Sequence, residues 1–312
     1  MRLAHISSRL LSRQISCPIR QLHRRPYSLA SDAINMRIAI TGARGTVGRA
    51  VVKQASEAGH STVQVDRTDT KYDGTPNSEM RTADTANDYK ATLEAFKGCD
   101  AVIHLAAIPD PLGKDDELVH NNNVTSAFNG FYAAAQLGIK RFCYASSVNA
   151  IGLEYATRPL KFDYFPIDEE VPSTPTDSYA LAKEEAEAQA RAFARWFPGM
   201  NIACMRIHAV ASREEAQQGH NERWEDSAVK SLWGWVSPEA TARACLLTVE
   251  KNDSFSGAEI FNVVAPTTTQ DTPSRELAKK YYPDTEIRGA FQGNESFFTA
   301  AKANRILGWK HE

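Results

Sequence analysis

A tyrosine and a lysine four positions apart, Tyr179 and Lys183, stand in the segment "DSYALAK". The surrounding stretch, 178–197, is rich in Ala, Glu and Arg and is followed by Pro198-Gly199, which predicts a helix. Residues at positions i and i+4 share a helix face, so the two side chains lie close together, whether they act in catalysis or only face solvent. A nearby ammonium favours a phenolate, and we expect Lys183 to lower the pKa of Tyr179 from about 10 toward neutrality, where the tyrosine could exchange a proton.

Two serines end the apolar run 140–147, the predicted strand that comes before this helix. Ser147 has a better spacing than Ser146 to Gly152, and its hydroxyl would hold a substrate oxygen beside the tyrosine. A polar turn at a strand end is the alternative for an isolated serine pair. The order of the motifs favours catalysis, because a glycine loop, an acidic residue, Ser147 and the tyrosine–lysine pair follow one another along the chain.

A glycine-rich loop, "TGARGTVG" at 41–48, directly follows the first predicted strand and opens the helical stretch 46–59. Gly42 permits a tight turn, Gly45 lets the backbone approach a pyrophosphate, and Gly48 allows the helix to pack closely on the strand. The helix would then direct its free N–H groups at the phosphates. The loop residues that we expect at a dinucleotide cofactor are Gly42, Arg44, Gly45, Thr46, Val47 and Gly48.

Asp66 ends the predicted strand 61–66, eighteen residues after the last glycine of the loop. A carboxylate at this place can accept hydrogen bonds from both hydroxyls of the adenosine ribose, and a 2′-phosphate would meet a like charge, so NAD is favoured. Arg44 and Arg67 could neutralise such a phosphate, which leaves NADP open. Asp84 could accept from the adenine amino group or could cap the helix that follows.

Short apolar runs alternate with helical stretches from residue 36 onward, which is the pattern of a parallel sheet with helices on both faces. We therefore predict an α/β fold, a Rossmann-type doubly wound parallel sheet with a small C-terminal substrate lobe. The dinucleotide-binding domain is expected at 36–207, and the lobe, partly interleaved with the main sheet, at 208–312. The predicted strands of the first domain are 36–41, 61–66, 100–107, 140–147 and 201–207.

The lobe is expected to contain a strand near "LWGW" (232–235), a helix and a second strand at 259–264. Ser237 is a typical helix cap and Pro238 suits the first turn, so the helix begins there. The two tryptophans of "LWGW" could stack on a sugar or ketone, or could pack inside the lobe. The remaining helices are predicted within 272–284 and 296–307.

The composition narrows the class of protein. The chain has 312 residues, of which 42% are hydrophobic and 24% charged, and it lacks an apolar run of about 18 residues, so we expect a globular protein with no membrane partner. The five cysteines and eight histidines form no cluster at ligand spacing, so we predict no metal site. Without residues 1–27 the chain has 30 basic and 38 acidic residues, and this excess of negative charge argues against nucleic acid as a partner.

The amino-terminal segment differs from the rest, since residues 1–31 carry six arginines and no acidic residue. Its apolar residues have roughly helical spacing, which is typical of mitochondrial presequences, and Arg25 lies three positions before Ser28, as in matrix cleavage patterns. We expect residues 1–30 to be a targeting or disordered segment. The protein is then expected in the mitochondrial matrix if residues 1–27 are a presequence, and in the cytoplasm otherwise; a later translation start is a further alternative.

From about residue 36 to its end, the sequence resembles the extended short-chain dehydrogenases/reductases, the NAD-dependent epimerase/dehydratase family. The resemblance implies that Ser147, Tyr179 and Lys183 are catalytic. It also implies a homodimer formed through the helices that follow the fourth and fifth strands. It rests on the segments "TGARGTVG", "AVIHLAA", "NNNVTSAFNGFYAAAQLGIKRFCYASS", "PIDEEVPSTPTDSYALAK", "MRIHAV" and "ANRILGW".

The resemblance implies further cofactor contacts after the fourth and later strands. Leu105, Ala106 and Ala107 would line the cofactor, Asn123 would lie at the wall between sheet and helix, and the loop after Ile207 would lie near the carboxamide.

Within the family, the sequence is most similar to uronate dehydrogenases, in which an arginine grips a substrate carboxylate. Arg206 stands at that position, so the resemblance implies that it contacts the substrate. Val148 and Asn149 stand where these enzymes carry Asn-His, and Asn149 is expected to replace part of their sugar recognition.

Together these features predict an NAD(P)-dependent oxidoreductase that moves a hydride between nicotinamide and a small hydroxy or carbonyl substrate, such as a sugar or sugar acid. Tyr179 is expected to be the general acid/base, Lys183 to tune it and bind the nicotinamide ribose, and Ser147 to position the reacting oxygen. A nucleotide-sugar epimerase or dehydratase, which returns the hydride to the same substrate, is an alternative. A non-catalytic dinucleotide-sensing protein is another.

Overall fold

The computed structural model describes residues 35–69, 74–222 and 225–311. These residues belong to one compact unit, Ile34–Glu312. The predicted targeting segment, 1–30, and its cleavage pattern lie outside the described residues.

Seven parallel strands form the main sheet in the order β3-β2-β1-β4-β5-β7-β8. The chain runs outward from β1 to β3 and then returns to β4 on the other side of β1, so the strand order reverses between β1 and β4. Both faces of a parallel sheet are covered, and the central strands are accordingly buried apolar runs. The strands are β1 Arg37–Thr41, β2 Ser61–Asp66, β3 Ser78–Thr82, β4 Ala101–His104, β5 Arg141–Ser147, β7 Asn201–Ile207 and β8 Ala258–Val263.

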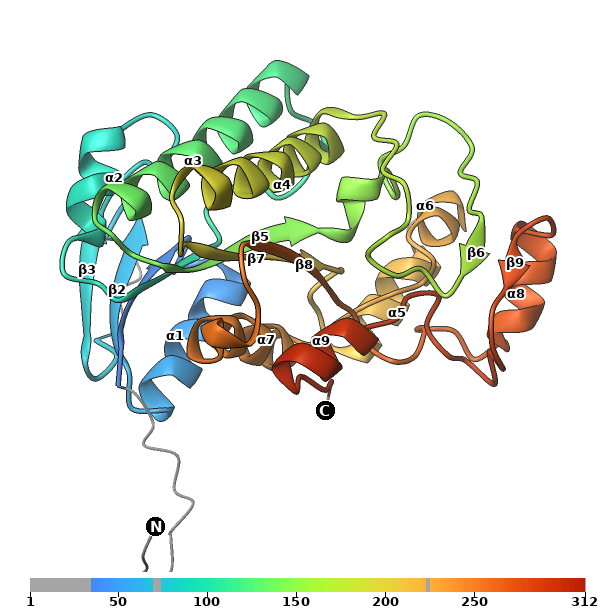
Figure 1. Ribbon diagram of the computed structural model, residues 1–312. Coiled ribbons are helices and arrows are strands. Elements are labelled where there is room, and N and C mark those ends of the chain that lie inside the picture. Colours follow the sequence, from blue (N-terminus) through green and yellow to red (C-terminus); the bar gives the residue numbers. More distant parts are fainter. Residues whose placement is uncertain (1–34, 70–73, 223–224, 312) are drawn as a thin grey trace, which may run out of the picture. The chain divides into compact units, whose positions relative to one another are not determined.

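Helices cover both faces of this sheet, with α2, α3 and α4 on one side and α1, α7 and α9 on the other (Figure 1). Local chemistry fixes several helix starts: the side chains of Asp88, Asp177 and Ser237 each accept a hydrogen bond from a backbone N–H of the first turn. The helices are α1 Thr46–Glu57, α2 Tyr89–Phe96, α3 Asp116–Gln136, α4 Ser178–Trp196, α5 Arg213–Glu222, α6 Glu225–Lys230, α7 Pro238–Glu250, α8 Ser274–Tyr281 and α9 Ala301–Leu307, with short 3₁₀ turns at Val148–Ile151 and Asn252–Ser254.

A smaller parallel sheet pairs β6 (Tyr164–Phe165) with β9 (Glu286–Ile287). Together with α6 and α8, these strands lie beyond the end of the main sheet (Figure 1). β8 belongs to the region that we assigned to the lobe, yet it is a strand of the main sheet. The division of the chain at residue 207 stays a prediction.

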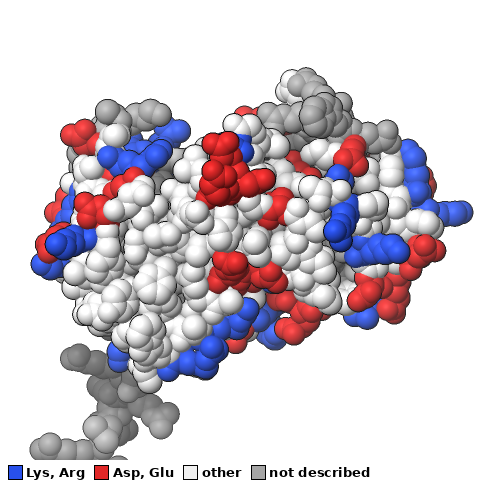
Figure 2. All heavy atoms as spheres, turned by 90° about the horizontal axis from the view of Figure 1, so that it is seen from above, with Lys and Arg blue, Asp and Glu red and all other residues white. Residues whose placement is uncertain are grey.

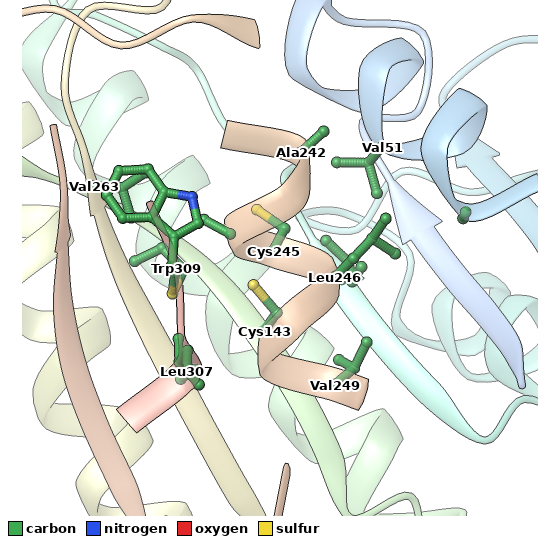
Figure 3. Packing of buried hydrophobic residues seen from close by; sticks show 14 of the residues in the cluster. Val51, Cys143, Ala242, Cys245, Leu246, Val249, Val263, Leu307 and Trp309 are labelled. Carbon is green, nitrogen blue, oxygen red and sulfur yellow. The ribbon is translucent and has the colours of Figure 1, made fainter. Parts of the chain in front are cut away.

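The core on the α7 side ties the carboxyl-terminal segment to the sheet. Figure 3 shows Cys245 of α7 beside Cys143 of β5, with Trp309 and Leu307 packed next to them. The indole Nε1 of Trp309 donates a hydrogen bond to the carbonyl of Ala240 at 2.9 Å. Burying a large apolar side chain contributes about 1.5–3 kcal/mol, so this cluster holds α7 and α9 against the sheet.

An aromatic core on the opposite face fixes the helix that carries the tyrosine–lysine pair. Phe131 of α3 packs on Phe142 of β5 and on Phe193 of α4, with ring centroids 4.9 and 5.5 Å apart. Such contacts add about 0.5–1.5 kcal/mol each to the burial of the rings. They set the position of α4 over the end of β5.

The α/β fold class predicted from the sequence is confirmed, as are the five strands predicted for the first domain. The helix that begins after Ser237 is confirmed too. The strand predicted near 232–235 is wrong: Leu232 and Trp233 have φ of +55° and +50°, outside the extended region, and only an isolated bridge joins Val236 to Val210.

Candidate functional site

A cavity of about 920 Å³ opens at the carboxyl ends of β1, β4, β5 and β7. It lies where the strand order reverses, which is the place where open α/β sheets bind ligands. All but one of the cofactor residues predicted from the sequence line it. They are Gly42, Arg44, Gly45, Thr46, Val47, Gly48, Asp66, Arg67, Asp84, Leu105, Ala106, Ala107, Tyr179, Lys183 and Ile207.

The glycine loop has no space for a side chain at Gly42 or Gly48. Gly42 has a φ of +63°, and a Cβ on it would lie 3.0 Å from the backbone nitrogen of Ala106. A Cβ on Gly48 would overlap the Gly42 carbonyl oxygen and would lie 2.7 Å from Ala43 Cα. α1 begins at Thr46 behind Gly45, which offers no side-chain cap to the first N–H groups of the helix. This backbone cradle at a helix start fits a pyrophosphate.

Asp66 stands at the ribose end of the cradle. Its carboxylate accepts hydrogen bonds from the backbone N–H groups of Arg44 (3.0 Å) and Arg67 (2.8 Å), which hold it at the mouth of the cavity. The Arg44 guanidinium donates to Gln64 Oε1 at 2.6 Å. The position of Asp66 fits a ribose diol.

Asp84, at the far wall of the same end, closes a backbone turn. Burial raises its pKa, but hydrogen bonds from Asn87 and from the Ala86 N–H outweigh burial, and the pKa lies below its usual value. Its carboxylate therefore caps this turn and also lines the cavity.

Ser147, Tyr179 and Lys183 meet at the other end, where α4 crosses the end of β5. The Ser147 oxygen accepts from the N–H of Asn149 at 3.1 Å, and the Ser147 side chain hydrogen bonds with the Tyr179 phenol. Lys183 Nζ donates to the carbonyl of Ala145 at 2.7 Å and lies 5.6 Å from the centre of the Tyr179 ring. The tyrosine–lysine pair is thus buried in the cavity wall and does not face solvent.

The expected fall in the Tyr179 pKa is not observed. Burial raises this pKa to about 12, although the Ser147 hydrogen bond lowers it. The Coulomb effects of Asp110, Asp177 and Glu154 raise it further. Desolvation of the phenolate is the largest cause, and Lys183 Nζ donates its hydrogen bond to the Ala145 carbonyl, so Tyr179 is here a neutral phenol that can donate a proton.

Lys183 shows the reverse effect. Burial lowers its pKa to about 8, while the nearby Glu187 carboxylate and then Cys204 raise it. Its ammonium also approaches the Tyr144 hydroxyl at 3.5 Å and lies over that ring, 5.0 Å from the centroid. The lysine is therefore held rigidly, with a proton that it can lose at mildly alkaline pH.

Two residues predicted from the resemblance lie outside the cavity lining. Arg206 is 5% exposed and its guanidinium pairs with the Glu187 carboxylate, so it is not available to a substrate carboxylate in this structure. Asn123 is buried and bonds through both its amide atoms to the backbone of Ile108, so it shapes the loop that the cofactor would touch. Asn149 lines the cavity as expected.

Sequence reasoning missed several groups at the substrate end. His208 directly follows β7, so its place at a strand end was a usable signal; its Nδ1 accepts from the Ala209 N–H at 2.7 Å, and its Nε2 contacts the Ser231 carbonyl at 2.9 Å. Tyr155 packs edge-on against Tyr179, with centroids 5.9 Å apart. No local signal marked Tyr155 or Ser231, because loops bring them to the site. The tryptophans of "LWGW" do not line the cavity.

The matched family model describes an NAD dependent epimerase/dehydratase family and covers residues 38–264. The chain belongs to this family. It is 31% identical over 209 residues to an L-arabinose 1-dehydrogenase (NAD(P)(+)) of Haloferax volcanii, a match that covers 65% of this chain and 78% of the relative. The chain is therefore an NAD(P)-dependent enzyme of the extended short-chain dehydrogenase/reductase type, as the sequence predicted.

Solved structures share the fold. A mutated uronate dehydrogenase superposes with a TM-score of 0.62 at 22% identity, covering 88% of this chain and 81% of that one. A short-chain dehydrogenase/reductase superfamily protein from Agrobacterium tumefaciens with bound NAD gives 0.65 at 20% identity, with coverage of 88% and 92%. At such identities the likeness concerns the fold.

Across the described ranges, no three His, Cys, Asp or Glu side chains are grouped as a metal site would need. None of the helices in that part of the chain is both long and apolar enough to cross a membrane.

Proposed function

We propose that this protein transfers a hydride between NAD(P) and a small hydroxy or carbonyl compound, such as a sugar or sugar acid. The observation that carries the proposal is the meeting of Ser147, Tyr179 and Lys183 at one end of the cavity that the glycine loop borders. The dehydrogenase relative, which acts on L-arabinose by its name, supports a sugar as substrate.

Each residue has a distinct task in this proposal. The Ser147 hydroxyl and the Tyr179 phenol hold the reacting oxygen. As a neutral phenol Tyr179 gives this oxygen a proton when a carbonyl is reduced; in the direction of oxidation it takes a proton from the hydroxyl after losing its own. The Lys183 ammonium stabilises the phenolate that forms when this proton leaves, and it binds the nicotinamide ribose. When bound, the nicotinamide supplies the hydride chemistry. Asn149 and Tyr155 line the same cavity and would contact the substrate.

The decisive experiment is a substrate screen of residues 28–312. Sugar acids and aldoses are offered with NAD or NADP, aromatic ketones are offered with the reduced dinucleotides, and reduced nicotinamide is followed by its absorbance. Oxidation of at least one hydroxy compound with a net rise in absorbance supports the proposal. Turnover without any net change in absorbance indicates an epimerase or dehydratase instead.

A non-catalytic role in dinucleotide sensing is the remaining alternative. It predicts that Tyr179→Phe leaves the cellular function unchanged, because the phenol hydroxyl would then have no chemical task. The intact set of Ser147, Tyr179 and Lys183 favours the enzyme.

NAD is the proposed cofactor ahead of NADP, because the Asp66 carboxylate would repel a 2′-phosphate. The Arg44 guanidinium, whose Nη1 donates to Gln64, lies at the same end of the cavity. Comparing Kd for the two dinucleotides by nicotinamide fluorescence tests the preference.

A homodimer formed through α3 and α4 is also proposed. These helices expose large apolar side chains, among them Leu118 (54%) on α3 and Trp196 (61%) on α4. Figure 2 views the molecule from this side and shows broad uncharged areas between groups of acidic side chains. Light scattering on the purified protein should give twice the chain mass, and Trp196→Glu should lower it; a monomer at all concentrations contradicts the proposal.

A mitochondrial destination is proposed from the basic, acid-free composition of residues 1–31. Residues 1–35 fused to a fluorescent protein should localise to mitochondria. Fluorescence spread through the cytoplasm contradicts this.

A further inference from the structure

Glu187 is a buried carboxylate that the catalytic set does not use. It lies on α4 four residues after Lys183, which itself lies four residues after Tyr179, so the three share one helix face. Their exposed fractions are 2% for Glu187, 3% for Lys183 and 7% for Tyr179. A carboxylate is expensive to bury unless it is paired and hydrogen bonded.

The pairing is complete. Arg206 donates from Nε to Glu187 Oε1 at 3.0 Å and from Nη2 to Oε2 at 2.9 Å, in the two-bond geometry that guanidinium and carboxylate favour. Ser146 Oγ donates to the same Oε1 at 2.7 Å. Ser146 and Arg206 lie opposite each other in the register of β5 and β7. One carboxylate therefore joins α4 to the ends of two strands.

These contacts reach the catalytic residues directly. Ser146 precedes Ser147 in the chain, so a hydrogen bond that fixes Ser146 also fixes the strand end that presents the Ser147 hydroxyl. Ala145, on the other side of Ser146, accepts from Lys183 Nζ. Three successive residues of β5 are thus held in relation to α4 or the cavity.

Charge also matters around Lys183. The groups that face it are Tyr144 of β5, Cys204 of β7, His104 of β4 and, on its own helix, Tyr179 and Glu187. Burial lowers the pKa of His104 to about 3, so this ring is neutral. Tyr144 and Cys204 are neutral as well, because burial raises both pKa values. Glu187 is the group in this set that offers negative charge to the ammonium.

Stability alone is a weak reason for such a pair. Replacing a buried ion pair by apolar side chains of similar volume is often neutral or stabilising. The Glu187–Arg206 pair lies between Lys183 and the end of β5 that carries the two serines, and this position indicates a role in the site beyond stability.

We propose that Glu187, clamped by Arg206, is a positioning residue that keeps Lys183 charged and holds the strand end with Ser147 against α4. This inference rests on the proposed hydride-transfer function. It also replaces the expectation that Arg206 grips the substrate: Arg206 acts through Glu187.

The test compares pH profiles of three variants with the unaltered protein. Glu187→Gln removes the negative charge in nearly the same shape, and Glu187→Leu/Arg206→Met removes the whole pair without leaving a lone buried charge. The alkaline limb of kcat/KM should move toward acid by about one pH unit in Glu187→Gln, because Lys183 loses its proton more easily. It should move in the same direction, but less, in the double variant, which also removes the positive charge of Arg206. Glu185→Gln makes the same chemical change on the half-exposed side of α4, where the carboxylate pairs with His120, and should leave the limb in place.

A second readout does not need a substrate. The affinity for reduced dinucleotide, measured by nicotinamide fluorescence across the same pH range, should fall where Lys183 loses its proton, and this fall should move with the Glu187 variants. The inference would be overturned if both Glu187 variants had lower rates or affinities but the same pH dependence as the unaltered protein. Such a result would indicate that Glu187 contributes to packing alone. Absence of dinucleotide binding by the unaltered protein would instead contradict the proposed function itself.

Discussion

The dinucleotide end of the cavity is built from backbone, whereas the catalytic end is built from long buried side chains. At the first end, the glycines Gly42 and Gly48 leave space, and the start of α1 has no side-chain cap, so we expect shape and backbone polarity to bind the dinucleotide. At the second, α4 directs Tyr179, Lys183 and Glu187 at the ends of β5 and β7.

The two ends of the cavity should therefore respond differently to substitution. Substitution at the backbone end should change affinity for the dinucleotide and leave the proton chemistry intact. Substitution at the side-chain end should change rate and pH dependence. Affinity at neutral pH should stay largely intact there, while the pH at which affinity falls should move when the charge of Lys183 is altered. A backbone-end variant that changes the pH dependence of the rate, or a side-chain-end variant whose affinity at neutral pH falls as much as its rate, would break the distinction.

The largest effect is expected for Tyr179→Phe. Loss of the phenol hydroxyl removes the acid/base group, and kcat/KM should fall by about 10² to 10⁴-fold. The dinucleotide Kd should stay close to its original value, because the ring that packs over Lys183 is kept. Steady-state kinetics and fluorescence titration check the two halves of this prediction. A fall in affinity as large as the fall in rate would contradict it.

Lys183→Met should change the pH dependence of stability. The pKa of Lys183 is lowered to about 8 from the model-compound value of 10.5, so between these pH values the unfolded chain binds a proton that the folded chain does not. Unfolding free energy should therefore rise with pH across this window, by about 3 kcal/mol from this group.

In Lys183→Met this contribution is absent, and the variant should gain most over the original protein below pH 8. Urea unfolding at several pH values between pH 7 and pH 10.5 measures the difference. An equal pH slope in both proteins would show that Lys183 carries its proton in the folded state throughout.

Gly48→Ala tests the backbone end. The added methyl group would overlap the Gly42 carbonyl, which must shift the loop. At about 1–3 kcal/mol for overpacking, dinucleotide affinity should fall roughly 5- to 150-fold. Gly219→Ala is the matched control, since a Cβ there meets nothing within 4 Å. Retained affinity in Gly48→Ala would mean that the loop adapts.

The smallest change is expected for Asp66→Asn, which alters selectivity more than binding. Losing the charged acceptor should weaken NAD by about tenfold, the value of one hydrogen bond to a charged group. NADP should be weakened less or improved, since the like charge is gone. Parallel titrations with both dinucleotides measure the ratio, and an unchanged ratio would place the 2′-position away from Asp66.

The dinucleotide end of the cavity could be predicted from the sequence because the residues that form it are close together in the chain. Glycines at fixed spacing between a strand and a helix, followed by an acidic residue at the next strand end, leave few geometric choices. Gly42, Gly48 and Asp66 accordingly line the cavity together. The central strands of the main sheet were predictable for a similar reason, since both their faces are buried.

The catalytic end of the cavity could be predicted from the sequence only in part. The spacing of Tyr179 and Lys183 predicted their shared face, but the pKa of Tyr179 depends on burial by neighbours that the sequence does not order. Arg206 was found at a strand end, yet its partner depends on Glu187 arriving from α4. β3 was not predicted from the sequence, because "SEMRT" (78–82) is a mostly polar edge strand without a buried apolar run.

The position of β8 in the sheet has a consequence for how the chain matures on the ribosome. β7, which carries Arg206, lies between β5 and β8, and β8 comes from Ala258–Val263. β1 to β5 can pair as soon as they leave the exit tunnel, but β7 gains its second neighbour only after most of the polypeptide has been synthesised. A nascent chain stopped before β8 would already contain the glycine loop that binds the nucleotide. Its catalytic end would still be incomplete, because β7 would lack one of its two neighbouring strands.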